Sequence, residues 1–169
     1  MRFLLLVFLS SVFFFACQTH RELPAGDYPN NVGDIAPDAT LDDTLFKVCR
    51  ENYIPQYYSL KSGFTGEKPA IEAYFREKFV KNRKHSRENG YITVRFVVNC
   101  RGESGRFRVQ EADLNLQPKQ FPPDLSAQLL RLTKGLNGWQ PGENQGLQID
   151  YYQYLTFKIA GGDIVAILP

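Results

Sequence analysis

The chain has 169 residues, with 20 Lys and Arg against 18 Asp and Glu. This length is enough for one domain with a substantial core. The formal net charge of +2 gives no indication of a nucleic-acid partner.

The first residues have the pattern of a secretion leader. Arg2 precedes a nearly continuous apolar run, Phe3–Phe15, which is shorter than the about 20 residues that a membrane-spanning helix needs. Ala16 and Cys17 follow, and this ending resembles the bacterial lipobox, in which the cysteine is acylated. The sequence therefore predicts a signal peptide over 1–16 and lipidation at Cys17. The alternatives are an ordinary signal peptide or a single N-terminal membrane anchor.

Residues 17–43 are polar and rich in proline, glycine, Asp and Asn, without periodicity. This composition predicts a flexible, lipid-attached tether. Gln18 takes the place of the aspartate that favours inner-membrane retention in lipoproteins, so the lipobox resemblance implies the outer membrane. No acidic run follows Cys17, which favours the periplasmic face over the cell surface.

The segment after the tether predicts one short strand, a loop and a helix. Thr44–Cys49 is interpreted as a short strand, and Tyr53–Leu60, interrupted by Pro55, as a packed loop. A helix is predicted over 69–83, since proline suits the first helical turn. The apolar positions that define one face of this helix are Ile71, Tyr74, Phe75 and Phe79.

The stretch Gly90–Val109 predicts the clearest element, a β-hairpin. Apolar residues alternate with polar ones from Ile92 to Val98, as expected for a strand with one buried face. Gly102 and Gly105 bracket the turn, where a positive φ favours glycine.

The second half predicts a helix followed by strands. A helix starts at Pro122–Asp124, with an apolar stripe at Leu125, Leu129, Leu132 and Leu136. Trp139–Gly142 is predicted as a turn with a buried indole. Gln148–Ile159 is predicted as one strand, and a turn at 160–163 joins it to a final strand, Ile164–Leu168.

This order of elements resembles the C-terminal domain of TonB. The resemblance covers roughly 44–159, and its best part is the hairpin, the second helix and the residues Trp139, Pro141, Gly142 and Gly146. It implies an α+β fold over 44–169, with two helices packed on a small antiparallel sheet. The proline-rich spacer and inner-membrane helix of a true TonB are not found in this sequence, so the resemblance implies the family's binding mode rather than energy transduction.

In that family the last strand of the sheet accepts a receptor peptide at its open edge. The resemblance therefore implies an envelope protein or peptide as the partner, for example one of TonB-dependent transport. The residues it assigns to partner binding are Tyr151, Tyr152, Tyr154, Thr156 and Lys158. Ile164–Leu168 either caps this edge or is displaced by the partner.

Cys49 and Cys100 remain once Cys17 is assigned to the leader. An envelope location favours a disulfide between them, and two separate thiols are the alternative. The two histidines lack metal-ligand spacing, and no nucleotide-binding or hydrolase motif is present, so we expect neither an enzyme nor a cofactor. The competing hypothesis is a structural or ligand-binding lipoprotein that recognises a glycan, lipid or small molecule. A concave pocket lined by Tyr57, Tyr58, Tyr151, Tyr152 and Tyr154 would favour this hypothesis, whereas a flat sheet face would favour the protein-interaction module.

Overall fold

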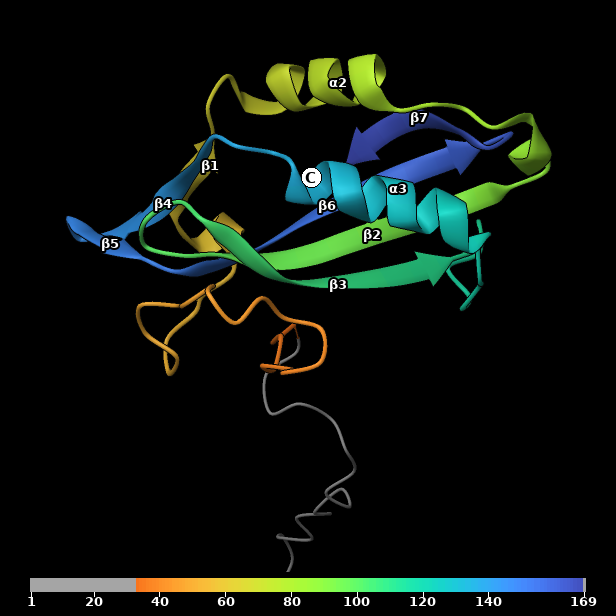
Figure 1. Cartoon of the computed structure of the whole chain (residues 1–169). Helices are drawn as coiled ribbons and strands as arrows, with labels where there is room; N and C mark the ends of the chain where they lie inside the picture. Colours follow the sequence, from red (N-terminus) through yellow and green to blue (C-terminus); the bar gives the residue numbers. More distant parts are fainter. Residues whose placement is uncertain (1–32, 169) are drawn as a thin grey trace, which may run out of the picture. The chain divides into compact units, whose positions relative to one another are not determined.

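The predicted hairpin lies at the centre of a four-stranded antiparallel sheet in the computed structural model, which describes residues 33–168 (Figure 1). Its strands are β2 (Asn89–Val98) and β3 (Ser104–Ala112), and the sheet order is β3-β2-β6-β7. The predicted turn contains Gly102 with a positive φ of 78°, as expected. Gly105 has another role, since a Cβ there would meet the ring of Phe46.

A second hairpin completes the sheet. β6 (Tyr151–Ala160) pairs with β2 along its whole length and, at its C-terminal half, with β7 (Asp163–Leu168). Gly161 and Gly162 form the turn with φ of 58° and 71°, a left-handed conformation that explains the glycine pair.

Two helices cover one face of this sheet, α2 (Glu67–Lys78) and α3 (Pro123–Lys134) (Figure 1). The α+β class with two helices on antiparallel strands is therefore confirmed. The predicted apolar stripe of α3 is buried as expected. The predicted 69–83 helix was placed too late: α2 ends where the backbone of Phe79 becomes extended, and Arg83–His85 forms the short 3-10 helix η3.

A separate three-stranded sheet, in the order β1-β4-β5, was not predicted. It consists of β1 (Lys61–Phe64), β4 (Trp139–Asn144) and β5 (Leu147–Ile149). The predicted turn at Trp139–Gly142 is wrong because β4 accommodates Pro141, which lacks an N–H, opposite an irregularity in the pairing with β1. The predicted single strand 148–159 is also wrong, because Asp150 separates β5 from β6.

Residues 33–56, which we call the N-terminal strap, run along the other face of the four-stranded sheet (Figure 1). Ile35 is buried there with Val97 and Tyr152, so the folded domain starts at 33 rather than at 44. The predicted strand Thr44–Cys49 is absent from the described chain. The 3-10 helix η2 (Tyr57–Ser59) follows the strap and lies within the segment that was predicted to be a packed loop.

Two arginines of β3 hold the strap through ion pairs. Arg108 contacts Asp42 at 2.6 Å, and Arg106 donates two hydrogen bonds, of 2.6 and 2.7 Å, to Glu51. These hydrogen bonds lower the pKa of both carboxyl groups, although burial opposes the shift.

We expect the strap to lose this support in acid. A carboxyl group with a lowered folded-state pKa stabilises the fold above its unfolded pKa of about 4 and loses that contribution as the pH falls through the folded value. The stability difference between the wild type and Asp42→Asn/Glu51→Gln should therefore shrink from pH 6 to about pH 2. Urea unfolding across this range measures it, and a difference that stays constant would contradict the assignment.

The predicted signal peptide, Cys17 and the first part of the tether lie outside the described residues. Within residues 33–168, no helix is long and apolar enough to cross a membrane.

Candidate functional site

The sheet edge expected at β6 is occupied by β7. Thr156 pairs with Leu168 and Lys158 with Ala166, so the C-terminal half of β6 lies inside the sheet. Both possibilities left by the sequence, a cap and a strand that a partner displaces, require this pairing in the unbound protein. The outer strands of the sheet are β7 and β3.

The five residues expected at this edge do not form one surface. Tyr151 points into the helix-covered core and donates a hydrogen bond of 2.9 Å to the carbonyl of Gln140, and burial raises its pKa. Tyr152 is buried under the N-terminal strap. By strand alternation Tyr154, Thr156 and Lys158 share the opposite face of β6 with Tyr152, and Thr156 contacts Thr93 at 2.9 Å.

The expected five-tyrosine pocket is also not formed. Of the five, Tyr57 and Tyr154 line a common cavity, whereas Tyr151 and Tyr152 point to opposite sides of the sheet and Tyr58 is 71% exposed.

A groove between α2 and β7 is the candidate site. Near the middle and C-terminal end of α2 it contains a cavity of about 400 Å³, lined by Phe75, Phe79 and the β7 residues Asp163–Ile167. Near the N-terminal end of α2 a cavity of about 220 Å³ is lined by Ile71, Ile167 and Leu168, among others. Ile167 contributes to both, so the two cavities follow one another along β7.

The backbone of β7 offers unpaired groups to this groove. Tyr152 donates its N–H to the carbonyl of Pro55, on the side of β6 away from β2. By strand alternation Thr156 and Lys158 direct their backbone groups to the same side, toward Leu168 and Ala166. Ile167, between these two, therefore directs its N–H and C=O outward. Within residues 33–168, no backbone hydrogen bond reaches it there.

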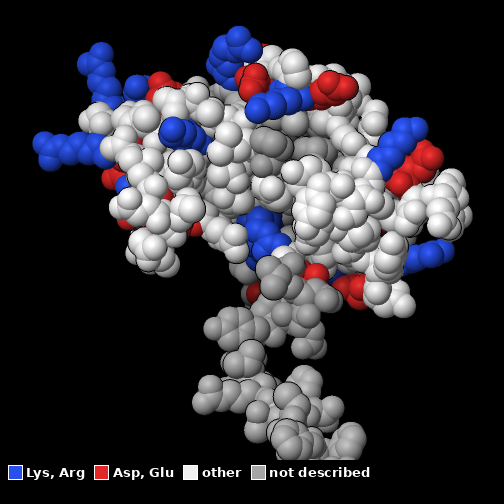
Figure 2. All heavy atoms as spheres, turned by 180° about the vertical axis from the view of Figure 1, so that it is seen from behind, with Lys and Arg blue, Asp and Glu red and all other residues white. Residues whose placement is uncertain are grey.

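Charged side chains of both signs line the rim of the groove. Glu72 and Arg76 of α2 border the larger cavity, Lys68 lies 4.0 Å from Glu72, and Lys81 lies 3.2 Å from Asp163. Figure 2 shows basic and acidic side chains next to one another along the upper edge of the face that it draws. The charges along the rim are therefore of mixed sign.

The other outer strand, β3, is a poorer edge. The loop after it returns to the strand, since Lys119 donates its N–H to the carbonyl of Glu111 and Pro118 bridges Ala112. Among the described pockets none lies along the outer edge of β3 in the way that the groove follows β7.

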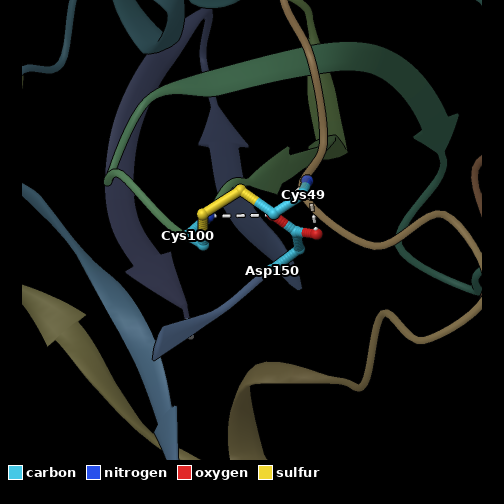
Figure 3. Close-up of side chains that lie close together, drawn as sticks. All are labelled: Cys49, Cys100 and Asp150. Atoms are coloured by element: carbon cyan, nitrogen blue, oxygen red, sulfur yellow. Dashed lines mark hydrogen bonds between the residues drawn. A yellow bond between two sulfur atoms is a disulfide. The ribbon is translucent and has the colours of Figure 1, made fainter. Parts of the chain in front are cut away.

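Cys49 and Cys100 form a disulfide that ties the N-terminal strap to the β2–β3 turn, as predicted (Figure 3). Asp150, which sequence reasoning missed, lies fully buried beside it. Its carboxylate accepts hydrogen bonds from the N–H groups of Cys49, Arg50 and Cys100 at 2.7–3.0 Å. The available signal was that Asp150 is the one acidic residue inside the predicted strand Gln148–Ile159.

This cluster does not fit a metal ion. Cys49, Cys100 and Asp150 are the only set of three or more possible ligands that comes together within the described part of the chain. However, both sulfurs are in the disulfide and the carboxylate is occupied by backbone donors. His85 is paired with Asp124 at 2.9 Å, which lowers the pKa of that carboxyl group.

Comparisons with protein-family models, curated proteins and solved structures found no match.

Proposed function

We propose that this protein is a lipid-anchored peptide-binding module of the bacterial cell envelope, which takes an extended segment of a partner as an additional strand on β7. The observation that carries the proposal is an outer strand that runs beside a helix-walled groove with apolar and charged lining residues. Strand addition uses these two features together: backbone hydrogen bonds give affinity, and pockets beside the strand accept alternate side chains.

The dimensions of β7 set the length of the bound segment. β7 has six residues, Asp163–Leu168, which corresponds to about 20 Å of extended chain. An added strand would lie about 4.8 Å beyond β7, with one set of alternate side chains under α2. We therefore expect segments of about six residues with apolar residues at alternate positions.

The envelope setting rests on the sequence. The leader and Cys17 support an outer-membrane anchor facing the periplasm, and the TonB-like order of elements supports a partner in TonB-dependent transport. The competing ligand-binding hypothesis gains no support from the five tyrosines, because they do not converge on one pocket.

Lysine at the edge of β7 is expected to weaken peptide binding about tenfold, because a charged side chain at an outer strand opposes strand pairing. Val165 is 54% exposed and lines the groove, whereas Leu147 of β5 is 56% exposed and lies outside it. Peptides are first selected from a random display library against the full chain. Their affinities for Val165→Lys and for the matched control Leu147→Lys are then measured by fluorescence anisotropy.

The proposal requires the Leu147→Lys protein to bind like the wild type. Equal affinities for all three proteins, or equal losses in both variants, would overturn it.

A further inference from the structure

The smaller cavity of the groove, which we call the Gln153 pocket, is built for more than a generic apolar side chain. It lies where β7 ends, and residues of η2, β1, α2, β4, β6 and β7 line it. Its apolar wall includes Ile71, Leu155 and Ile167, which are all nearly fully buried.

Gln153 gives this wall a polar group with a fixed orientation. Its side chain is buried on the helix-covered side of β6, with the residue only 9% exposed. The Oε1 atom accepts a hydrogen bond of 2.8 Å from the N–H of Tyr154. Because a backbone N–H can only donate, the side-chain oxygen must be the atom that meets it, and Nε2 is left as a donor. Among the described residues Nε2 has no hydrogen-bond partner, and it is not one of the fully enclosed atoms.

This arrangement coincides with a gap in the pairing of β6. Tyr152 is paired with Pro55 and Gln56, and Thr156 is paired with Leu168. Tyr154 lies between them, and the Gln153 side chain supplies the acceptor that a neighbouring strand would otherwise supply. A strand added to β7 lies on the side away from β6, so a long side chain next to Leu168 must extend past the end of β7 to reach this gap.

Aromatic rings make up much of the remaining wall. Tyr57 and Tyr154 meet edge to face at 5.4 Å, and Phe64 and Trp139 at 4.9 Å. Such surfaces favour another aromatic ring in offset or edge-to-face contact. The Tyr154 hydroxyl, together with burial, raises the pKa of Tyr57 to about 12, so Tyr57 is neutral at physiological pH.

We infer that the Gln153 pocket binds an aromatic side chain that carries an oxygen acceptor, as tyrosine does, presented by the strand bound on β7. The ring packs against Tyr57 and Phe64, and the oxygen accepts a hydrogen bond from Gln153 Nε2. That a strand bound on β7 presents this side chain rests on the proposed function. The aromatic and hydrogen-bonding character of the pocket does not depend on the proposed function.

The pocket is tested on the full chain without any peptide. Trp139 is the single tryptophan and lines the pocket, so its fluorescence reports occupancy. The probes are 4-methylanisole and 4-ethyltoluene, which have similar shape and differ by an ether oxygen in place of a methylene group. We expect the wild type to bind 4-methylanisole about five- to tenfold more tightly, as one additional hydrogen bond provides. A purely apolar pocket would prefer 4-ethyltoluene.

Two variants locate the effect. Gln153→Glu keeps an acceptor for the Tyr154 N–H and, above neutral pH, has no donor, so it should lose the preference for 4-methylanisole. Gln148→Glu makes the same change at an exposed position of β5 and should keep it. A preference for 4-ethyltoluene in the wild type, an unchanged preference in Gln153→Glu, or no fluorescence response to either probe would overturn the pocket assignment.

The source is tested with a selected peptide that places tyrosine beside Leu168. We expect this peptide to displace 4-methylanisole, and its tyrosine-to-alanine version to bind without displacing it. If neither peptide displaces the probe, the bound strand is excluded as the source. The Val165→Lys protein should bind 4-methylanisole normally, because Val165 lies outside this pocket. A failure of strand addition therefore leaves the pocket result intact.

Discussion

Replacing Cys49 and Cys100 together by alanine is expected to lower the free energy of unfolding by about 4 kcal/mol. The disulfide joins residues separated by 51 positions. In the loop-closure model, closing a loop of that length lowers the entropy of the unfolded chain and thereby raises the free energy of unfolding by this amount. The N-terminal strap should remain attached, because the ion pairs of Arg106 and Arg108 with Glu51 and Asp42 do not depend on the sulfurs.

Urea unfolding of the full chain, with Cys17 replaced by serine in both proteins, measures the difference. The same sample provides a thiol count: the oxidised, denatured Cys17→Ser protein should contain no free thiol. Two free thiols, or a difference below about 1 kcal/mol, would contradict the role assigned to the disulfide.

Replacing Asp150 by alanine is expected to lower the free energy of unfolding by about 3–4 kcal/mol. The carboxylate is fully buried and accepts hydrogen bonds from three backbone N–H groups, those of Cys49, Arg50 and Cys100. Removing it leaves these donors without a partner, at about 1–3 kcal/mol each when no water reaches them.

The matched control is Asp43→Ala. Asp43 also accepts a backbone hydrogen bond, from Leu45, but it does so at the exposed surface, where water replaces the lost acceptor. Its cost should stay below about 1 kcal/mol. Because Asp150 contacts the segments that the disulfide joins, the Asp150→Ala and cysteine variants should be non-additive. Equal, small effects of the two aspartate substitutions would show that Asp150 does not organise the turn.

The local sequence pattern was sufficient to predict the central strand β2, the helix α3 and the last hairpin. The alternation from Ile92 to Val98 is enough for a half-buried strand, and the leucine stripe of α3 is enough for a helix against a sheet. The glycine pair at 161–162 was enough for the last hairpin. The disulfide was predicted from two further premises: an oxidising location, and the two cysteines that remain once Cys17 is assigned to the leader.

The errors arise where tertiary contacts outweigh local signals. Pro141 indicated a turn, but β4 tolerates it because the pairing with β1 is irregular at that point. Residues 33–43 have the composition of a tether, but Ile35 finds a site between Val97 and Tyr152, and Arg108 binds Asp42. The sequence of the N-terminal strap alone does not indicate that Ile35 packs on the sheet or that Asp42 pairs with Arg108.

The candidate site could not be located from the sequence for the same reason. The sequence placed the candidate edge at β6 and left open whether Ile164–Leu168 covers it; the pairing of β7 with β6 moves the outer edge to β7. The groove depends on the distance between α2 and β7, and the Gln153 pocket depends on the end of β7 lying beside Tyr154. Both are set by how the helices pack on the sheet, not by the residues that line the cavities.

The most direct test of strand addition is amide hydrogen exchange in the full chain, with and without a peptide selected from the display library. The outward N–H of Ile167 should exchange much more slowly when the peptide is bound, because it becomes part of a new strand pair. The amides of Ala166 and Leu168, which already face β6, should change less. Unchanged exchange at Ile167 under saturating peptide, with protection appearing along β3 or on another surface, would contradict the proposed binding site.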